Sequence, residues 1–158
     1  MKKKILITGG NGLVGSAIKK KINKKIFLVK SIDIKDRKKI DITKRKFINY
    51  LNKLNPDIII HTAAHPGGLS MQNPLKNIKI NLVSTFKIID WCANNKKKLI
   101  FLSSSAVYAS KKAGNKETEK LSPRTVYGIN KVACENYIQT IAKFKKFNWI
   151  IFRLLQHT

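Results

Sequence analysis

The chain has 158 residues, 43% of them hydrophobic, which is enough for one domain with a buried core. Its 33 lysines and arginines outweigh 8 aspartates and glutamates, giving a net charge of +25. No run approaches the ~18 consecutive apolar residues that a membrane span needs, and the N-terminus does not resemble a signal peptide.

Strand and helix patterns alternate along the chain. Short apolar runs predict strands at Ile5–Thr8, Ile26–Val29, Asp57–His61, Lys98–Leu102 and Trp149–Phe152. Helical spacing predicts helices at Leu13–Lys21, Lys44–Leu54, Pro74–Asn94 and Tyr127–Lys143. Thr43 is the expected N-cap of the second helix. Such alternation is typical of βαβ units, so we expect an α/β fold: a Rossmann-type, doubly wound parallel sheet in three αβα layers.

The excess positive charge raises the question of a nucleic-acid partner. Only four basic residues are arginines, whereas recognition of phosphates and bases tends to use the planar guanidinium beside stacking aromatics. The lysines are spread from Lys2 to Lys146 among many isoleucines and asparagines, which favours a solvated cationic surface. We therefore expect no nucleic-acid partner and, without a spanning run, no membrane partner.

Two cysteines and several aromatic or histidine residues have no motif spacing. Cys92 and Cys134 are expected to be reduced thiols, which indicates a cytoplasmic location and no metal site. Trp91 and Trp149 stand among apolar neighbours and are expected in the core. His61, at a strand end, is expected to be structural, while His65, beside Pro and Gly, is expected on the surface unless it touches a substrate.

The glycines after the first strand carry the clearest functional signal. Gly9, Gly12 and Gly15 begin the first helix, where glycine permits positive φ and close approach of backbone amides to a pyrophosphate. The candidate cofactor residues in this loop are Gly9, Asn11, Gly12, Leu13, Val14 and Gly15.

Asp33 ends the second strand, eighteen residues beyond Gly15 and close to the spacing of ~20 expected for an acid on the adenosine ribose. A carboxylate there favours NAD, since it binds the 2′-hydroxyl and repels a 2′-phosphate. Lys35 and Arg37 lie nearby and could pair with that phosphate, so NADP stays open.

Tyr127 and Lys131 lie four residues apart and share one helix face. Lowering a tyrosine pKa from 10 to about 7 requires roughly 4 kcal/mol of preferential phenolate stabilisation. A neighbouring ammonium and a cationic nicotinamide ring can supply that field. A serine from the Ser103–Ser105 run, after the fourth strand, can orient a substrate oxygen.

Five segments in this order resemble a known family: TGGNGLVGS, HTAAH, INLVST, SSSAVY and YGINK. They are similar to extended short-chain dehydrogenases/reductases, within these to the NAD-dependent epimerase/dehydratase group that acts on nucleotide sugars. The resemblance implies that Tyr127 is the catalytic base, Lys131 its partner and Ser104 the third catalytic residue, with Ser105 as the alternative.

The same resemblance implies further cofactor contacts. Asp41 and Ile42 would meet the adenine, and Ala63 and Ala64 would line the cofactor after the third strand. Asn81 would support the active site from its helix. Tyr127 and Lys131 would also touch the cofactor.

Departures from the family pattern argue against some of the reactions that family members catalyse. Family dehydratases carry an Asp-Glu pair where this chain has Ser105 and Ala106, which argues against a 4,6-dehydratase. Ala106 also stands where 3,5-epimerase/4-reductase members have a reactive cysteine. A UDP-glucose 4-epimerase-like epimerase or dehydrogenase is therefore favoured, with a 4-keto-sugar reductase or a non-catalytic NAD(P)-binding protein as alternatives.

Members of the resembled family are about twice this length, and their second half binds the sugar. We therefore expect residues 1–158 to form an NAD(P)-binding Rossmann domain, with the C-terminal sugar-binding domain absent. The resemblance implies a nucleotide-sugar substrate, and a homodimer through the helices bearing Asn81 and Tyr127.

Overall fold

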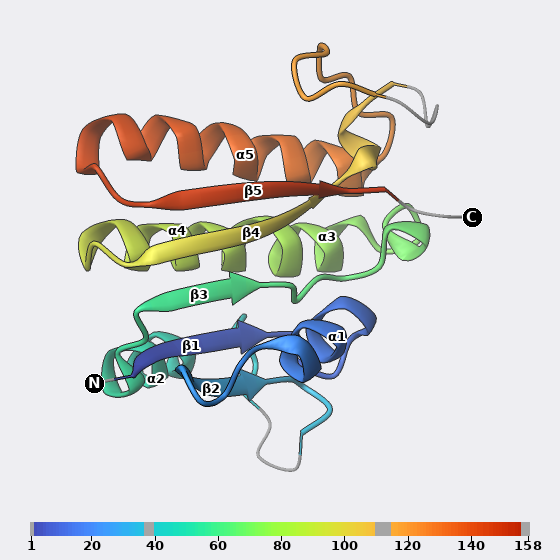
Figure 1. Cartoon of the computed structure of the whole chain (residues 1–158). Coiled ribbons are helices and arrows are strands. Elements are labelled where there is room, and N and C mark those ends of the chain that lie inside the picture. Colours follow the sequence, from blue (N-terminus) through green and yellow to red (C-terminus); the bar gives the residue numbers. More distant parts are fainter. Residues whose placement is uncertain (1, 37–39, 110–114, 156–158) are drawn as a thin grey trace.

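The computed structural model describes residues 2–36, 40–109 and 115–155 (Figure 1). Five strands form one parallel sheet: β1 (Lys3–Thr8), β2 (Phe27–Ile32), β3 (Ile58–His61), β4 (Lys98–Ser104) and β5 (Trp149–Leu154). Their order in space is β2-β1-β3-β4-β5. All five predicted strands and the α/β fold class are confirmed.

Helices cover both faces of this sheet (Figure 1). On one face lies α1 (Leu13–Lys21), whose Val14 and Ile18 pack against apolar residues of β1 and β3. On the other face lie α2 (Lys46–Leu54), α4 (Ser84–Asn94) and α5 (Val126–Lys145), which share the main core with Leu6, Ile59 and Phe101. Among the described residues no helix is long and apolar enough to span a bilayer.

The predicted single helix over Pro74–Asn94 consists of three pieces. It begins as α3 (Pro74–Asn77), widens into a π-helical turn (Ile78–Val83) and continues as α4. The Ser84 backbone N–H and hydroxyl both donate to the carbonyl of Lys79, five residues earlier, the hydroxyl at 2.9 Å. Widened turns of this kind occur mostly at functional sites, and this one contains the buried Asn81.

The expected N-cap at Thr43 is wrong. The backbone N–H of Thr43 donates to the Asp41 carboxylate at 2.8 Å, and that of Lys44 donates to the Asp41 carbonyl. Since Thr43 belongs to this Asp-centred turn, the helix begins later, at Lys46, with no side-chain cap. A short polar residue before an apolar repeat fits a turn as well as a cap.

The two tryptophans differ. Trp91 is buried, as predicted, and its indole N–H donates to Asn52. Trp149 is 37% exposed, because β5 is the last strand of the described sheet and pairs only with β4. An apolar neighbourhood in sequence does not reveal which strand lies at an edge.

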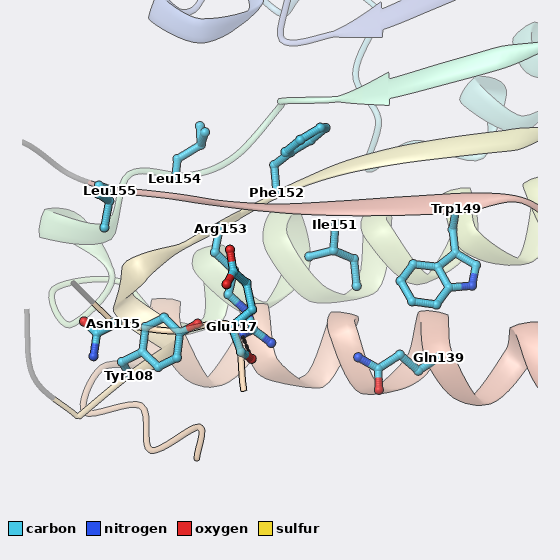
Figure 2. Close-up of a pocket in the computed structure, with 10 residues that line it drawn as sticks. All are labelled: Tyr108, Asn115, Glu117, Gln139, Trp149, Ile151, Phe152, Arg153, Leu154 and Leu155. Atoms are coloured by element: carbon cyan, nitrogen blue, oxygen red, sulfur yellow. Dashed lines mark hydrogen bonds between the residues drawn. The ribbon is translucent and has the colours of Figure 1, made fainter. Parts of the chain in front are cut away.

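A buried ion pair attaches β5 to α5. Arg153 donates from Nε and Nη2 to the carboxylate of Glu135, with a shortest distance of 2.8 Å, and Glu135 is fully buried. The remaining Nη1 donates to the Tyr108 hydroxyl at 2.6 Å and the Glu117 carbonyl at 2.8 Å. Figure 2 shows Arg153, Tyr108 and Glu117 beside a hollow of about 400 Å³ along β5.

Replacing Arg153→Met should destabilise the fold by about 3–5 kcal/mol, because the buried Glu135 carboxylate loses its partner. Adding Glu135→Gln should restore most of that loss. Urea unfolding of both variants measures the effect, and a single variant that costs under about 1 kcal/mol would contradict it.

Candidate cofactor and catalytic site

The candidate site lies where strand order reverses. β1 has β2 on one side and β3 on the other, so the connections that follow β1 and β3 leave toward opposite faces. The crevice at such a point, outside the carboxyl ends of the strands, is where open α/β sheets bind ligands. The predicted site segments after β1, β3 and β4 all lie at this edge (Figure 1).

The glycine loop is pressed against the chain that follows β3. Gly9 has φ +72°, and a Cβ there would lie 2.7 Å from the backbone of Ala63. A Cβ on Gly15 would lie 2.2 Å from the Gly9 carbonyl oxygen and 2.8 Å from Thr62 Oγ1. Thr62 in turn donates to the Thr8 carbonyl at 2.6 Å. These positions leave no space for a side chain, so glycine is required at both for the loop to pack this closely.

A carboxylate pair joins this loop to the end of β2. Asp33 accepts from the Asn11 backbone N–H at 3.0 Å, and Asp36 accepts from the Asn11 side-chain amide at 2.7 Å. Asp36 also accepts from the Asp33 backbone N–H at 2.7 Å. Sequence reasoning missed Asp36, whose only signal is that it stands three residues after the predicted ribose acid. Lys35 is exposed, and Arg37 lies outside the described residues.

Several predicted cofactor residues are spread around this crevice. Leu13 is 90% exposed at the start of α1, whereas Val14 turns toward the sheet. Ile42 is buried in the main core, so only its backbone can face an adenine. Ala63 packs partly against the core and Ala64 is exposed, both directly after β3. Gly12 opens α1 as its N-cap.

The amide of Asn81 holds the loop after β3. Its oxygen accepts from the His65 backbone N–H at 2.7 Å, and its nitrogen donates to the His65 carbonyl at 3.0 Å. Asn77 accepts from Asn81 at 3.1 Å and from Asn130 on α5 at 2.8 Å. A supporting role is thus visible for Asn81, and a direct cofactor contact stays a prediction.

His65 is not on the surface as expected, since only 7% of it is exposed. Its Nδ1 lies 3.3 Å from the Asn77 amide nitrogen. The amide oxygen of Asn77 already accepts two amide N–H groups, so the nitrogen faces the ring as a donor. His65 Nδ1 is therefore the acceptor of this hydrogen bond.

His61 is structural, as expected. Its Nδ1 lies 2.6 Å from Thr8 Oγ1 and its Nε2 lies 2.9 Å from Thr85 Oγ1. Burial lowers the pKa of His61 to about 3, and the nearby Lys131 ammonium adds to the effect. The ring therefore stays neutral and joins β1 to α4.

Ser104, Tyr127 and Lys131 converge at the end of β4. Lys131, four residues after Tyr127 on α5, places Nζ 5.5 Å from the centre of the Tyr127 ring. Nζ donates to the Leu102 carbonyl at 2.6 Å and lies 4.5 Å from the Phe101 ring centre. Ser104 starts the short 3-10 turn that follows β4, and Gly67 packs against the Tyr127 ring from the other side.

The pKa of Tyr127 is raised above its ordinary 10, because burial disfavours the phenolate, while the Ser104 hydroxyl opposes this in part. From the sequence we expected Lys131 to lower the pKa of Tyr127. Burial also lowers the pKa of Lys131 to about 8. In the chain by itself, Tyr127 and Lys131 therefore lie close together and Tyr127 is protonated.

Comparison with known proteins identifies the family of the chain. The family model described as "NAD dependent epimerase/dehydratase family" matches residues 5–158. The chain belongs to this family. The UDP-glucose 4-epimerase of Mycoplasma genitalium is 30% identical over 181 aligned residues, which cover 96% of this chain and 52% of that protein. The chain spans about half the length of the curated relatives it matches first.

Solved structures show the same fold. The Thermus thermophilus UDP-glucose 4-epimerase in complex with NAD has a TM-score of 0.86 at 23% identity, covering 95% of this chain and 54% of that chain. The Bacillus anthracis dTDP-4-dehydrorhamnose reductase in complex with NADP has a TM-score of 0.84 at 23% identity, covering 97% and 53%. The predicted family, enzyme class and NAD(P) cofactor class are thus confirmed at the level of the family.

Gly15→Ala should destabilise the fold by at least about 2 kcal/mol, because the new Cβ must displace the Gly9 carbonyl. Gly68→Ala is the matched control, since a Cβ there meets nothing within 4 Å, and it should change stability by less than about 0.5 kcal/mol. Urea unfolding compares the two, and equal stabilities would contradict the close approach.

Lys131→Met should stabilise the fold at pH 7 by about 2 kcal/mol, because it removes a buried ammonium. In the unfolded chain the lysine pKa returns to about 10.5. The destabilisation by Lys131 is therefore complete below pH 8 and fades as the pH rises from 8 toward 10.5, and the advantage of the variant should fade with it.

Urea unfolding at pH 7 and at pH 10.5 measures this difference. The exposed Lys53→Met is the control and should show no such pH-dependent gain. A Lys131→Met protein no more stable than the parent chain at pH 7 would show that the ammonium is not costly to bury.

Proposed function

We propose that this chain is the NAD-binding part of an enzyme that oxidises and re-reduces one carbon of a nucleotide sugar, as a UDP-glucose 4-epimerase does. The observation that carries the proposal is the convergence of Ser104, Tyr127 and Lys131 at the end of β4, at the same edge of the sheet as the glycine loop after β1. The similarity to a UDP-glucose 4-epimerase along 96% of the chain supports it.

The residues of the crevice suit a dinucleotide. The first N–H groups of α1 lack helical partners and can bind the pyrophosphate. Gly9 and Gly15 let this loop pack closely on the chain after β3, where a side chain at either position would clash. Asp33 would bind the ribose hydroxyls and Asp41 would border the adenine. Ala63 and Ala64 would line the cofactor after β3. When bound, NAD accepts a hydride from the substrate carbon.

The chain's own groups handle the proton. Tyr127 takes the proton of the sugar hydroxyl as the C–H hydride leaves, which converts the alcohol to a ketone. Ser104 orients the oxygen, and the Lys131 ammonium favours the phenolate once the cofactor adds its positive charge. Bound NAD would also supply the hydride for the opposite face, and Tyr127 would return its proton to the oxygen, which would give the epimer.

Asp33 also supports the choice of NAD over NADP. Its carboxylate is fixed by the Asn11 and Lys35 backbone N–H groups, at 3.0 Å each, in a position that would repel a 2′-phosphate. Competitive calorimetric titration with the two cofactors tests this preference.

Two measurements test the proposal. Calorimetry should show that the purified chain binds NAD, and a protein that joins the chain to a sugar-binding half should convert UDP-glucose to UDP-galactose without net NADH. Failure to bind NAD or NADP contradicts the proposal. Binding without turnover identifies a cofactor-binding module, and stoichiometric loss of NAD(P)H with a keto-sugar identifies a reductase.

Tyr127→Phe should bind NAD as the parent chain does and lose turnover by about 10²–10⁴-fold, since it removes the proton acceptor but keeps the ring. A steady-state assay measures the loss. Ser105→Ala is the matched control, because Ser104 is the serine that acts on Tyr127. Full turnover in Tyr127→Phe would contradict the proposed mechanism.

A further inference from the structure

The charges of this chain are unevenly distributed between the two edges of the sheet: one edge is almost entirely basic, and the other carries charges of both signs. At the left of Figure 1, where the strands begin, short lysine runs precede or start β1, β2, β4 and β5. These runs are residues 2–4, 24–25, 96–98 and 145–146. We call this side the amino edge.

Asp57 is the one carboxylate at the amino edge among the described residues. It accepts from the Lys4 backbone N–H at 2.8 Å and pairs with Lys97 Nζ at 3.5 Å. These contacts hold its pKa below the ordinary range, so its charge is retained but already compensated. The amino edge therefore presents a strongly positive surface.

The opposite edge is different. Most of the remaining acidic residues follow the carboxyl ends of the strands, in the segments that include Asp33, Asp36, Asp41, Glu117 and Glu119. A uniform enrichment in lysine would not remove acids from one edge and keep them at the other.

The negative ends of helices attract lysines and explain part of this pattern. Lys21, Lys53 and Lys145 lie in the last turns of α1, α2 and α5. Residues 2–4, 24–25 and 96–98 are in strands or in connections outside any helix. Helix-end electrostatics therefore does not account for most of the amino edge.

Two exposed apolar side chains project among these lysines. Phe144 is 79% exposed in the last turn of α5, between Lys143 and Lys145. Ile26 is 57% exposed and follows Lys24 and Lys25. Neither side chain belongs to the hydrophobic core, so packing does not explain why these positions are apolar. Each side chain has lysines next to it in the sequence.

The amino edge also contains a hollow of about 300 Å³. It is lined by Lys3, residues 96–98, Asp57 and the amide side chains of Asn95 and Asn148. The hollow offers ammonium and amide donors at once, which is the chemistry that holds a phosphate group.

We propose that the amino edge binds the surface of an anionic lipid bilayer, with the lysines on the headgroups and Phe144 and Ile26 inserted between the lipids. Lysine clusters are attracted to anionic leaflets, and a second, apolar contribution makes the attachment stable. The expectation of no membrane partner rested on the lack of a spanning run, which surface binding does not require.

The observations favour a lipid surface over nucleic acid. The described amino edge contains lysines without arginines, and its exposed apolar residues include an isoleucine, which cannot stack on a base. A membrane bound at the amino edge would also leave the proposed cofactor crevice free, because the crevice lies at the opposite edge of the sheet.

Sedimentation with vesicles tests the proposal. The chain should bind phosphatidylcholine vesicles containing about 30% phosphatidylserine and not vesicles of phosphatidylcholine alone. Lys24→Glu/Lys25→Glu should weaken binding at least tenfold, roughly the effect of reversing two lysines at an anionic surface. Ile26→Ser and Phe144→Ser should each weaken it roughly tenfold as apolar contacts are lost.

Lys76→Glu/Lys120→Glu is the charge-matched control, because both exposed lysines lie away from the amino edge, and it should bind the vesicles within about twofold of the parent chain. Calorimetric binding of NAD by each variant shows separately whether the cofactor site is intact. The proposal is overturned if the parent chain ignores anionic vesicles, or if the control is as weak as Lys24→Glu/Lys25→Glu. It is also overturned if Ile26→Ser and Phe144→Ser bind as the parent does, or if duplex DNA binds more tightly than vesicles at equal salt.

Discussion

The arrangement of this molecule depends on one buried cation. The Lys131 ammonium is almost fully enclosed. Within the described residues it donates to one acceptor, the Leu102 carbonyl at 2.6 Å, and it lies over the Phe101 ring. That bond attaches α5 to β4 and thereby sets where Tyr127, one turn earlier, meets Ser104. Its field also adds to the effect of burial, which lowers the pKa of His61. Burying an ammonium is unfavourable, so the fold gives up stability here to hold a charge next to a phenol.

A second set of contacts limits how that phenol can move. The π-helical turn directs Asn81 inward, where its amide binds both backbone groups of His65, and Asn77 connects this loop to Asn130 on α5. Gly67, two residues after His65, packs on the Tyr127 ring. Three elements that are distant in sequence thus close around one side chain through hydrogen bonds between buried amides. Such networks specify a single arrangement, because each unpaired amide would be costly.

The sequence was sufficient for the parts of this structure that local rules govern. Strand positions followed from short apolar runs, and the glycine pattern located the loop at the start of α1. It was insufficient where a contact is made across the fold. The burial of His65 and the role of Asp36 depend on partners 12 to 25 residues away in the chain. The raised pKa of Tyr127 is caused by burial, which the spacing of residues in the sequence does not reveal. The exposure of Trp149 depends on which strand is last in the sheet, which is a property of topology.

The outer side of β5 gives the high net charge a further meaning. In the described part of the chain this strand has one paired edge, and Trp149, Phe152 and Leu154 are each more than a third exposed (Figure 2). A flat apolar strand of this kind is a template for pairing between identical molecules. Two copies that each carry +25 repel one another before their strands can meet. The lysines thus act as a colloidal barrier whose range shrinks to about 3 Å in 1 M salt, so the solubility of this protein is governed by ionic strength as much as by its fold.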